Sequence, residues 1–275
     1  MSKRWMITGS SRGLGLALAE AVLAAGDHAL ITARDPSCLR HLVARHGGRV
    51  RVAALDVTDA TAAAAAVRIA VDAFGGLDVL VNNAGYGNVG SVEDTTLADF
   101  RGQIEANLFG TIIVSKAVIP VMREQRSGHI IQLSSVGRRL GAPGRAAYSA
   151  AKWGVEGFSE SLALEMALVG VKVTLVEPGG FRTDFAGSST SLVEGRPDYD
   201  AVVGAAVRRQ REYDGKQPGD PARAAQAIIR IANADCPPLR VALGKDAFSA
   251  IEQADRSRAE ERARWEALSI STDYP

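Results

Sequence analysis

The chain has 275 residues, enough for one large α/β domain or two small ones, and its 47% hydrophobic and 23% charged residues are typical of a soluble globular protein. Its net charge of +1 gives no electrostatic reason to expect binding to nucleic acid or to an anionic membrane. We find no run of about 18 apolar residues and no apolar signal-peptide region, so we expect neither a membrane-spanning helix nor a secretion signal.

Cysteine and histidine are few and scattered. Cys38 and Cys236 lie far apart in unlike contexts, which argues against a disulfide framework and favours a reducing, cytoplasmic compartment. No histidine has zinc-ligand spacing to a cysteine or to another histidine, so we predict no metal site. The four histidines are His28, His41, His46 and His129.

Short β-rich segments alternate with helical patterns along the chain. Strands are predicted at 4–8, 28–33, 51–57, 77–85, 128–135, 171–180 and 239–243. Helices are predicted at 14–26, 59–74, 99–125 and around Tyr148. Pro120 lies inside the third of these helices, where we expect it to kink or weaken the helix.

The alternation predicts a single α/β domain over residues 1–275, with a doubly wound, parallel, seven-stranded sheet covered by helices on both faces. Two segments depart from this alternation of strands and helices. Residues 185–220, which begin with the small and polar stretch 185–199, are expected to form a substrate lid. Residues 245–275 form a charged helical extension, which we expect to be a solvated helix docked through Ile251, Trp265 and Leu268, with binding to a partner as the alternative.

A glycine-rich loop, TGSSRGLG at residues 8–15, lies where the first strand passes into the first helix. Gly9, Gly13 and Gly15 allow a tight turn and a close approach to a ligand, and the helix N-terminus offers free N–H groups to a pyrophosphate. The segment 9–13 also fits G-x-S-x-G, the nucleophile elbow of hydrolases. Such a hydrolase needs a histidine late in the chain, and none follows His129.

The end of the second strand predicts which dinucleotide binds. Ala33 stands where an acid would hold a ribose hydroxyl, and Arg34 follows it, so Arg34 and Arg12 can grip a 2′-phosphate. We therefore predict NADP(H), with an exposed loop charge as the alternative role of Arg34. Asp35, just before a proline, is predicted to cap a helix. Asp56 either accepts from the adenine amino group or caps the following helix.

Tyr148 and Lys152 lie four residues apart, and a helix places both side chains on one face. Together with the glycine loop, the segment NNAG at 82–85, and PGG at 178–180, this motif resembles the short-chain dehydrogenase/reductase family over about residues 3–245. The resemblance implies a single-domain Rossmann fold and a catalytic tetrad of Asn107, Ser135, Tyr148 and Lys152. The predicted cofactor-binding residues are Gly9, Ser11, Arg12, Gly13, Leu14, Gly15, Arg34, Asp56, Val57, Asn83, Ala84, Gly85, Tyr148, Lys152, Pro178, Gly179 and Thr183.

The resemblance also implies a role for each member of the tetrad. A free tyrosine has a pKa of about 10, and a nearby Lys⁺ and an oxidised nicotinamide both lower it. Tyr148 then exchanges a proton with the substrate oxygen, and the Ser135 hydroxyl stabilises developing charge on that oxygen. Lys152 holds the nicotinamide ribose, and Asn107 holds a water that passes protons to Lys152.

The substrate is less determined. Its wall is expected at 136–145, at 179–183 and in the lid, and Arg138, Arg139 and Arg145 either attract an acidic or phosphate-bearing substrate or belong to a solvated loop. The C-terminal third resembles members that reduce ketones on steroid- or retinoid-like molecules. The alternatives are a 3-oxoacyl-thioester reductase and, in another class, a non-catalytic NADP(H) sensor, which would be expected to lose Tyr148 or Lys152.

The family usually forms dimers or tetramers through the helices that carry Asn107 and Tyr148, so we expect a homodimer or homotetramer. Apolar residues on these two helices permit such pairing but are equally consistent with a core position. They are Ile112, Ile113, Phe158 and Leu162.

Overall fold

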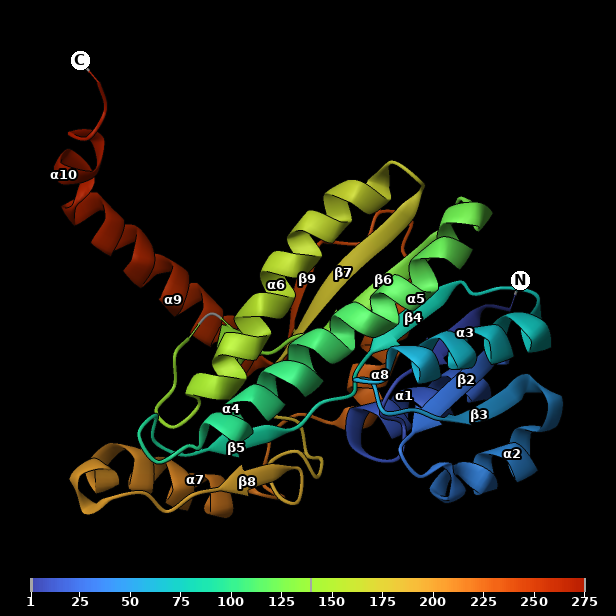
Figure 1. Cartoon of the computed structure of the whole chain (residues 1–275), viewed down its shortest axis with the longest axis horizontal. Coiled ribbons are helices and arrows are strands. Elements are labelled where there is room, and N and C mark those ends of the chain that lie inside the picture. The colour runs from blue at the N-terminus through green and yellow to red at the C-terminus, as the bar shows by residue number, and fades with distance from the viewer. Residues whose placement is uncertain (1, 139, 275) are drawn as a thin grey trace.

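A computed structural model describes residues 2–138 and 140–274 and confirms the predicted α/β fold (Figure 1). Its main sheet has seven parallel strands in the order β3-β2-β1-β4-β6-β7-β9. From β1 the chain adds β2 and β3 on one side and then β4, β6, β7 and β9 on the other. The strand order therefore reverses between β1 and β4, which is the topological switch point of the sheet. The strands are β1 (Arg4–Ile7), β2 (His28–Ala33), β3 (Val50–Ala54), β4 (Val79–Asn82), β6 (Gly128–Leu133), β7 (Val171–Pro178) and β9 (Arg240–Leu243).

Helices cover both faces of this sheet and give it two apolar cores. On β1, Trp5 and Ile7 belong to one core and Met6 belongs to the other, because successive side chains of a strand point to opposite faces. One face carries α1 (Gly13–Ala24), α2 (Arg40–His46) and α8 (Pro221–Asn233). The other carries α3 (Ala60–Phe74), α5 (Gly110–Gln125) and α6 (Ala146–Ala167).

The helix predicted at 99–125 is present but is not uniform. It consists of α4 (Leu97–Ile104), a π-helical turn (Glu105–Phe109) and α5, which continues through Pro120. Among the described residues, the stretch Leu97–Gln125 is the one helix long and apolar enough to cross a membrane by length and composition. One third of its most apolar window is buried inside the protein, and Val118 and Met122 of this stretch are fully buried in the core.

Core packing also decides the role of the residues considered for subunit pairing. Leu162 lies within the core on the α3–α5–α6 face, and Ile113 and Phe158 pack against it. These three residues therefore have an intramolecular role.

The segment expected to form a lid contains structure that the sequence analysis did not predict. A small parallel sheet pairs β5 (Gly87–Val89) with β8 (Thr190–Leu192). The helix α7 (Ala205–Tyr213) lies beside this sheet at one end of the molecule (Figure 1). Short helical turns complete the chain: 3₁₀ turns at Pro36–Leu39, Gly47–Arg49, Val136–Arg138 and Pro197–Tyr199, and a π turn at Asp200–Gly204.

The C-terminal extension is helical as predicted, with α9 (Lys245–Arg264) and α10 (Glu266–Ile270) projecting from the body (Figure 1). The predicted docking residues are wrong in two cases, because Trp265 and Leu268 are 60% and 61% exposed. Ala247 and Ala254 are the buried residues of α9, and the Arg258 guanidinium lies 5.1 Å from the centroid of the Trp153 ring on α6, so the contact with the domain extends past the first turns of the helix. The helix is too highly charged along its length to offer a continuous apolar face.

Candidate active site

The carboxyl ends of the central strands open into a cavity of about 1040 Å³. Such an edge is where open α/β sheets bind their ligands. All four members of the predicted tetrad line this cavity, as does every predicted cofactor residue except Gly15. Gly15 lies behind the loop instead, where a Cβ would come within 2.4 Å of the Asn83 side-chain amide and of the Gly9 carbonyl. Its lack of a side chain therefore serves packing between α1 and the strands.

The glycine loop is held against β4 by Asn83. Its Nδ2 donates to the carbonyls of Thr8 (2.9 Å) and Gly9 (3.0 Å). Gly9 has a φ of +66°, and a Cβ there would lie 2.8 Å from the Ala84 Cα, so only glycine fits. No side chain caps α1 and no acid lies in its first turn, which leaves its N–H groups available to an anion. This cradle fits the pyrophosphate of a dinucleotide.

The adenosine end of the cavity has two arginines and a satisfied aspartate. Arg12 and Arg34 line the cavity beside Ala33, so both can approach a 2′-phosphate. Asp35 caps a 3₁₀ turn by accepting from the Ser37 N–H (2.9 Å), which confirms the predicted cap. Asp56 lies within the cavity lining.

The helix-cap alternative for Asp56 is wrong, because the neighbouring Asp59 caps α3. Asp56 instead accepts from the backbone and hydroxyl of Thr58. These hydrogen bonds, together with the charge of Arg34, lower the pKa of Asp56. A carboxylate that is ionised and faces the cavity is available to accept from an amino group.

The pKa of Tyr148 differs from the sequence-based expectation. Burial raises this pKa, and a hydrogen bond from Ser135 and the charge of Arg145 lower it only in part. The Lys152 ammonium donates to the Leu133 carbonyl (2.7 Å) and lies 5.8 Å from the centroid of the Tyr148 ring. Burial lowers the pKa of Lys152 to about 8. In the chain without its cofactor, Tyr148 is therefore a protonated acid.

Asn107 occupies the π turn and is fully buried. Its Nδ2 donates to the Tyr86 carbonyl (3.0 Å) and to the Gln103 carbonyl and side-chain oxygen (both 3.1 Å). These bonds fix the amide so that Oδ1 faces Gly85, where a Cβ would come within 2.4 Å of it. Oδ1 has no hydrogen-bond partner among the described residues, so it is free to accept from a water.

Residues of the 185–220 segment that the sequence analysis did not name individually also line the cavity. Gln210 and Tyr213 of α7 line it, as does Gln217 from the following loop. These residues lie in a polar segment with no distinctive motif, so only the fold brings them to the site. Of the predicted basic wall, Arg145 lines the cavity, whereas Arg139 lies outside the described residues.

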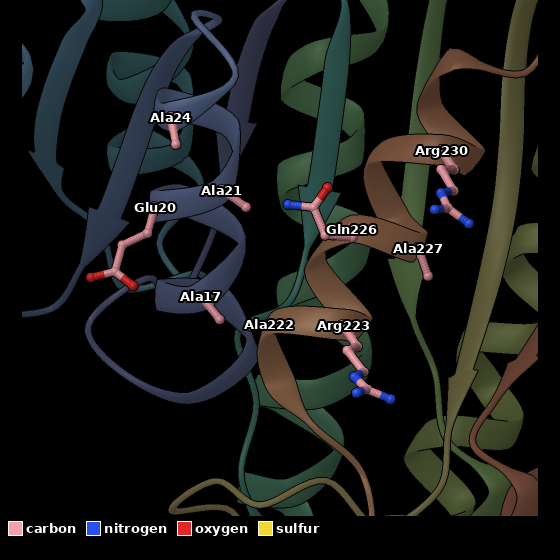
Figure 2. Close-up of a pocket in the computed structure, with 9 residues that line it drawn as sticks. All are labelled: Ala17, Glu20, Ala21, Ala24, Ala222, Arg223, Gln226, Ala227 and Arg230. Carbon is pink, nitrogen blue, oxygen red and sulfur yellow. The ribbon is translucent and has the colours of Figure 1, made fainter.

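A second depression, of about 690 Å³, lies between α1 and α8 (Figure 2). Alanines form most of its lining, and Glu20, Arg223 and Arg230 stand at its edges (Figure 2). None of the predicted site residues belongs to it, and the described residues contain no cluster of His, Cys, Asp and Glu that could hold a metal ion.

Known proteins are similar to this chain in sequence. The family model for short chain dehydrogenases matches residues 3–193. Oxidoreductase BOA17 from Botryotinia fuckeliana is 46% identical over 273 residues, covering 99% of this chain and 100% of the relative. A 3-ketodihydrosphingosine reductase from Bacteroides thetaiotaomicron is 36% identical and covers 87% of both chains.

Solved structures agree with the fold. A short-chain dehydrogenase from Streptomyces avermitilis superposes with a TM-score of 0.93 at 41% identity and covers 100% of both chains. An alcohol dehydrogenase from Thermococcus sibiricus, complexed with 5-hydroxy-NADP, superposes with a TM-score of 0.71 at 26% identity, covering 88% of this chain and 96% of that one. The chain belongs to the short-chain dehydrogenase/reductase family and is an oxidoreductase that acts on CH–OH groups.

Proposed function

We propose that the protein is an NADP(H)-dependent reductase of a hydrophobic ketone, with Tyr148 as the proton donor. The observation that carries the proposal is the convergence of Ser135, Tyr148 and Lys152 on one cavity, next to a glycine cradle that fits a dinucleotide. A sensor without catalysis would not need these groups to converge.

The choice of NADP(H) over NAD(H) rests on Arg12 and Arg34. Both line the cavity beside Ala33, where no carboxylate takes the place of a ribose ligand. The archaeal neighbour is complexed with an NADP derivative, which is consistent with this choice. A Cβ on Gly13 would lie 3.4 Å from the Thr183 Cβ, so the chain after β7 passes close to the glycine loop.

When bound, the nicotinamide supplies the hydride that the carbonyl carbon accepts. The Tyr148 hydroxyl donates its proton to the carbonyl oxygen, and the Ser135 hydroxyl donates a hydrogen bond to the same atom. Because the pKa of Tyr148 is raised by burial, its proton stays in place until the oxygen becomes basic. Lys152 and a water held by Asn107 Oδ1 then return a proton to Tyr148.

The hydrophobic character of the substrate rests on the rings that face the cavity. Phe181, Phe185 and Tyr213 line it, and the Phe185 ring lies 5.7 Å from that of Tyr148. A relative of the chain, from Bacteroides thetaiotaomicron, is a 3-ketodihydrosphingosine reductase, which is consistent with a ketone substrate. We further propose a cytoplasmic location, supported by the two exposed free thiols of Cys38 and Cys236, and a homo-oligomeric state.

The test is NADPH consumption with a panel of hydrophobic ketones, aldehydes, quinones and 3-oxoacyl thioesters. The proposal predicts highest kcat/KM on ketones and a lower Kd for NADPH than for NADH. Faster turnover of thioesters would favour the acyl-thioester reductase instead. Tight NADPH binding with no turnover of any carbonyl would favour the sensor.

A further inference from the structure

Arg145 is a half-buried cation at the substrate side of the cavity, one helical turn before Tyr148. Its Nη2 donates to Oε1 of Gln210 (2.5 Å), and the Nε2 of Gln210 donates to the Ala186 carbonyl (2.7 Å). The guanidinium therefore has a neutral partner on the lid helix α7. No carboxylate of the described residues forms an ion pair with it.

The surroundings of Arg145 direct the guanidinium toward the substrate space. A Cβ on Gly87 would lie 3.2 Å from Arg145 Nη1 and 3.4 Å from Phe185 Cζ, so strand β5 leaves room for both side chains. Phe185 in turn stacks at a tilt against Tyr148. Arg145, Phe185 and Tyr148 thus line the same cavity, and the Phe185 ring lies near both the guanidinium and the proton donor.

A guanidinium in this position is costly unless something pairs with its charge. Arginine stays protonated in proteins, and burying a cation against neutral partners leaves part of its solvation free energy unrecovered. Burial lowers the pKa of Arg145 accordingly. A carboxylate is the group that best restores the lost solvation, because it can accept two parallel hydrogen bonds from the guanidinium.

A second polar group in the same lid region lacks a partner. Gln217 is 1% exposed and lines the cavity, and neither its Oε1 nor its Nε2 has a hydrogen-bond partner among the described residues. Buried amides are nearly always satisfied in folded proteins, so its side chain is available to a bound ligand. The lid therefore contributes both a cation and an amide that the protein itself leaves incompletely paired.

We propose that the substrate is a ketone bearing a carboxylate, and that Arg145 is the specificity residue that binds this carboxylate while the ketone lies at Tyr148. The inference rests on the proposed reductase function and names its substrate class. A monoanion fits better than a phosphate dianion, because Arg145 is a single cation and Asp184 also lines the cavity.

A purely structural role predicts a different outcome. If Arg145 only holds α7 through Gln210, then its loss should impair all substrates alike. Arg145→Gln removes the charge. Gln210→Glu gives Arg145 a carboxylate partner from the protein itself, at the cost of the hydrogen bond that Gln210 Nε2 donates to the Ala186 carbonyl. Arg208→Gln is the matched control, because Arg208 is an exposed lid arginine that pairs with Asp200.

The probes are benzoylalkanoates of increasing chain length, each tested beside its neutral methyl ester. The measured quantity is the ratio of kcat/KM for the acid to that for the ester, in which general effects on Tyr148 or on folding cancel. We expect the wild type and Arg208→Gln to prefer one acid of the series. Both Arg145→Gln and Gln210→Glu should lower that ratio by roughly 10- to 100-fold, as for a hydrogen bond to a charged group.

Two results would overturn the inference. The first is that the wild-type protein reduces the esters as well as the acids, in a reaction that requires Tyr148. This result would refute the carboxylate inference but would still support the reductase function. The second is a ratio that stays unchanged in both Arg145→Gln and Gln210→Glu, as a structural latch would require. Absence of Tyr148-dependent turnover on every acid and ester would instead contradict the proposed function, and the inference would fall with it.

Discussion

Lys152→Met should stabilise the fold at neutral pH and abolish activity. Lys152 is 5% exposed, and burial lowers its pKa from 10.5 to about 8. At about 1.4 kcal/mol per pH unit, this difference corresponds to about 3 kcal/mol by which the folded state disfavours the ammonium. Methionine fills a similar volume without a charge.

The two pKa values of Lys152 determine how the stabilisation by Lys152→Met changes with pH. The unfolded chain keeps the Lys152 proton up to about pH 10.5, whereas the folded chain releases it near pH 8. Between these values the unfolded state binds more protons, so wild-type stability rises with pH in that window. The cost of the buried ammonium is fully present below pH 8 and absent above pH 10.5. The gain from Lys152→Met is therefore largest at pH 7.

The assay is urea unfolding of wild type and Lys152→Met at a series of pH values without cofactor. Loss of the hydrogen bond to Leu133 should cost the variant about 1 kcal/mol at every pH, which does not alter the trend. The difference in unfolding free energy should therefore shrink by about 3 kcal/mol between pH 7 and pH 10.5. Lys116→Met, at an exposed position on α5, should give a flat difference. A flat difference for Lys152→Met as well would refute the reasoning.

Three further predictions follow from the site and the core. Arg34→Gln should raise the Kd for NADPH roughly 5- to 30-fold, as expected for one exposed charge-assisted contact, while fluorescence titration shows little change for NADH. Gly9→Ala should lower the free energy of unfolding by about 2–4 kcal/mol in urea titrations, because it combines a positive φ with a contact 2.8 Å from Ala84 Cα. Burial lowers the pKa of His129 to about 4. As the pH falls from about 6.5 to 4, the wild type should lose about 3 kcal/mol of unfolding free energy that His129→Gln retains. Equal loss of unfolding free energy in the two proteins over this pH range would contradict the prediction.

The sheet and its glycine loop could be predicted because their signals are local. Apolar strands such as β1 and β4 are buried on both faces and read as continuous hydrophobic runs. Asp35 followed by a proline is a cap that depends on neighbouring residues alone, and the structure has it. The tetrad was predicted from the resemblance to a family, and the structure brings its four members to one cavity.

The internal structure of the segment expected to form a lid could not be predicted, because its contacts are formed between distant segments. Strands β5 and β8 have three residues each, too few for a periodicity to show, and they pair across about 100 residues of chain. The tertiary surroundings of Arg145 depend on Gln210, which lies 65 residues away in the sequence. The sequence-based expectation was a lowered pKa for Tyr148, whereas burial raises this pKa in the chain without its cofactor. The spacing of Tyr148 and Lys152 does not reveal that burial.

The C-terminal extension shows a different limit. Its helical pattern was sufficient to predict α9, but apolar residues such as Trp265 and Leu268 do not by themselves indicate what they contact. Whether an apolar side chain docks depends on the direction in which the helix leaves the domain. Here α9 leads away from the sheet (Figure 1).

Replacement of Tyr148 by Phe tests the central claim most directly, because it removes one hydroxyl and keeps the ring that packs against Phe185. We would measure NADPH consumption with the best ketone, beside NADPH binding by fluorescence and thermal unfolding. The account predicts that turnover falls by at least about 100-fold, the usual contribution of a positioned general acid, while binding and stability stay close to wild type. Turnover that survives in a folded Tyr148→Phe variant would contradict the account.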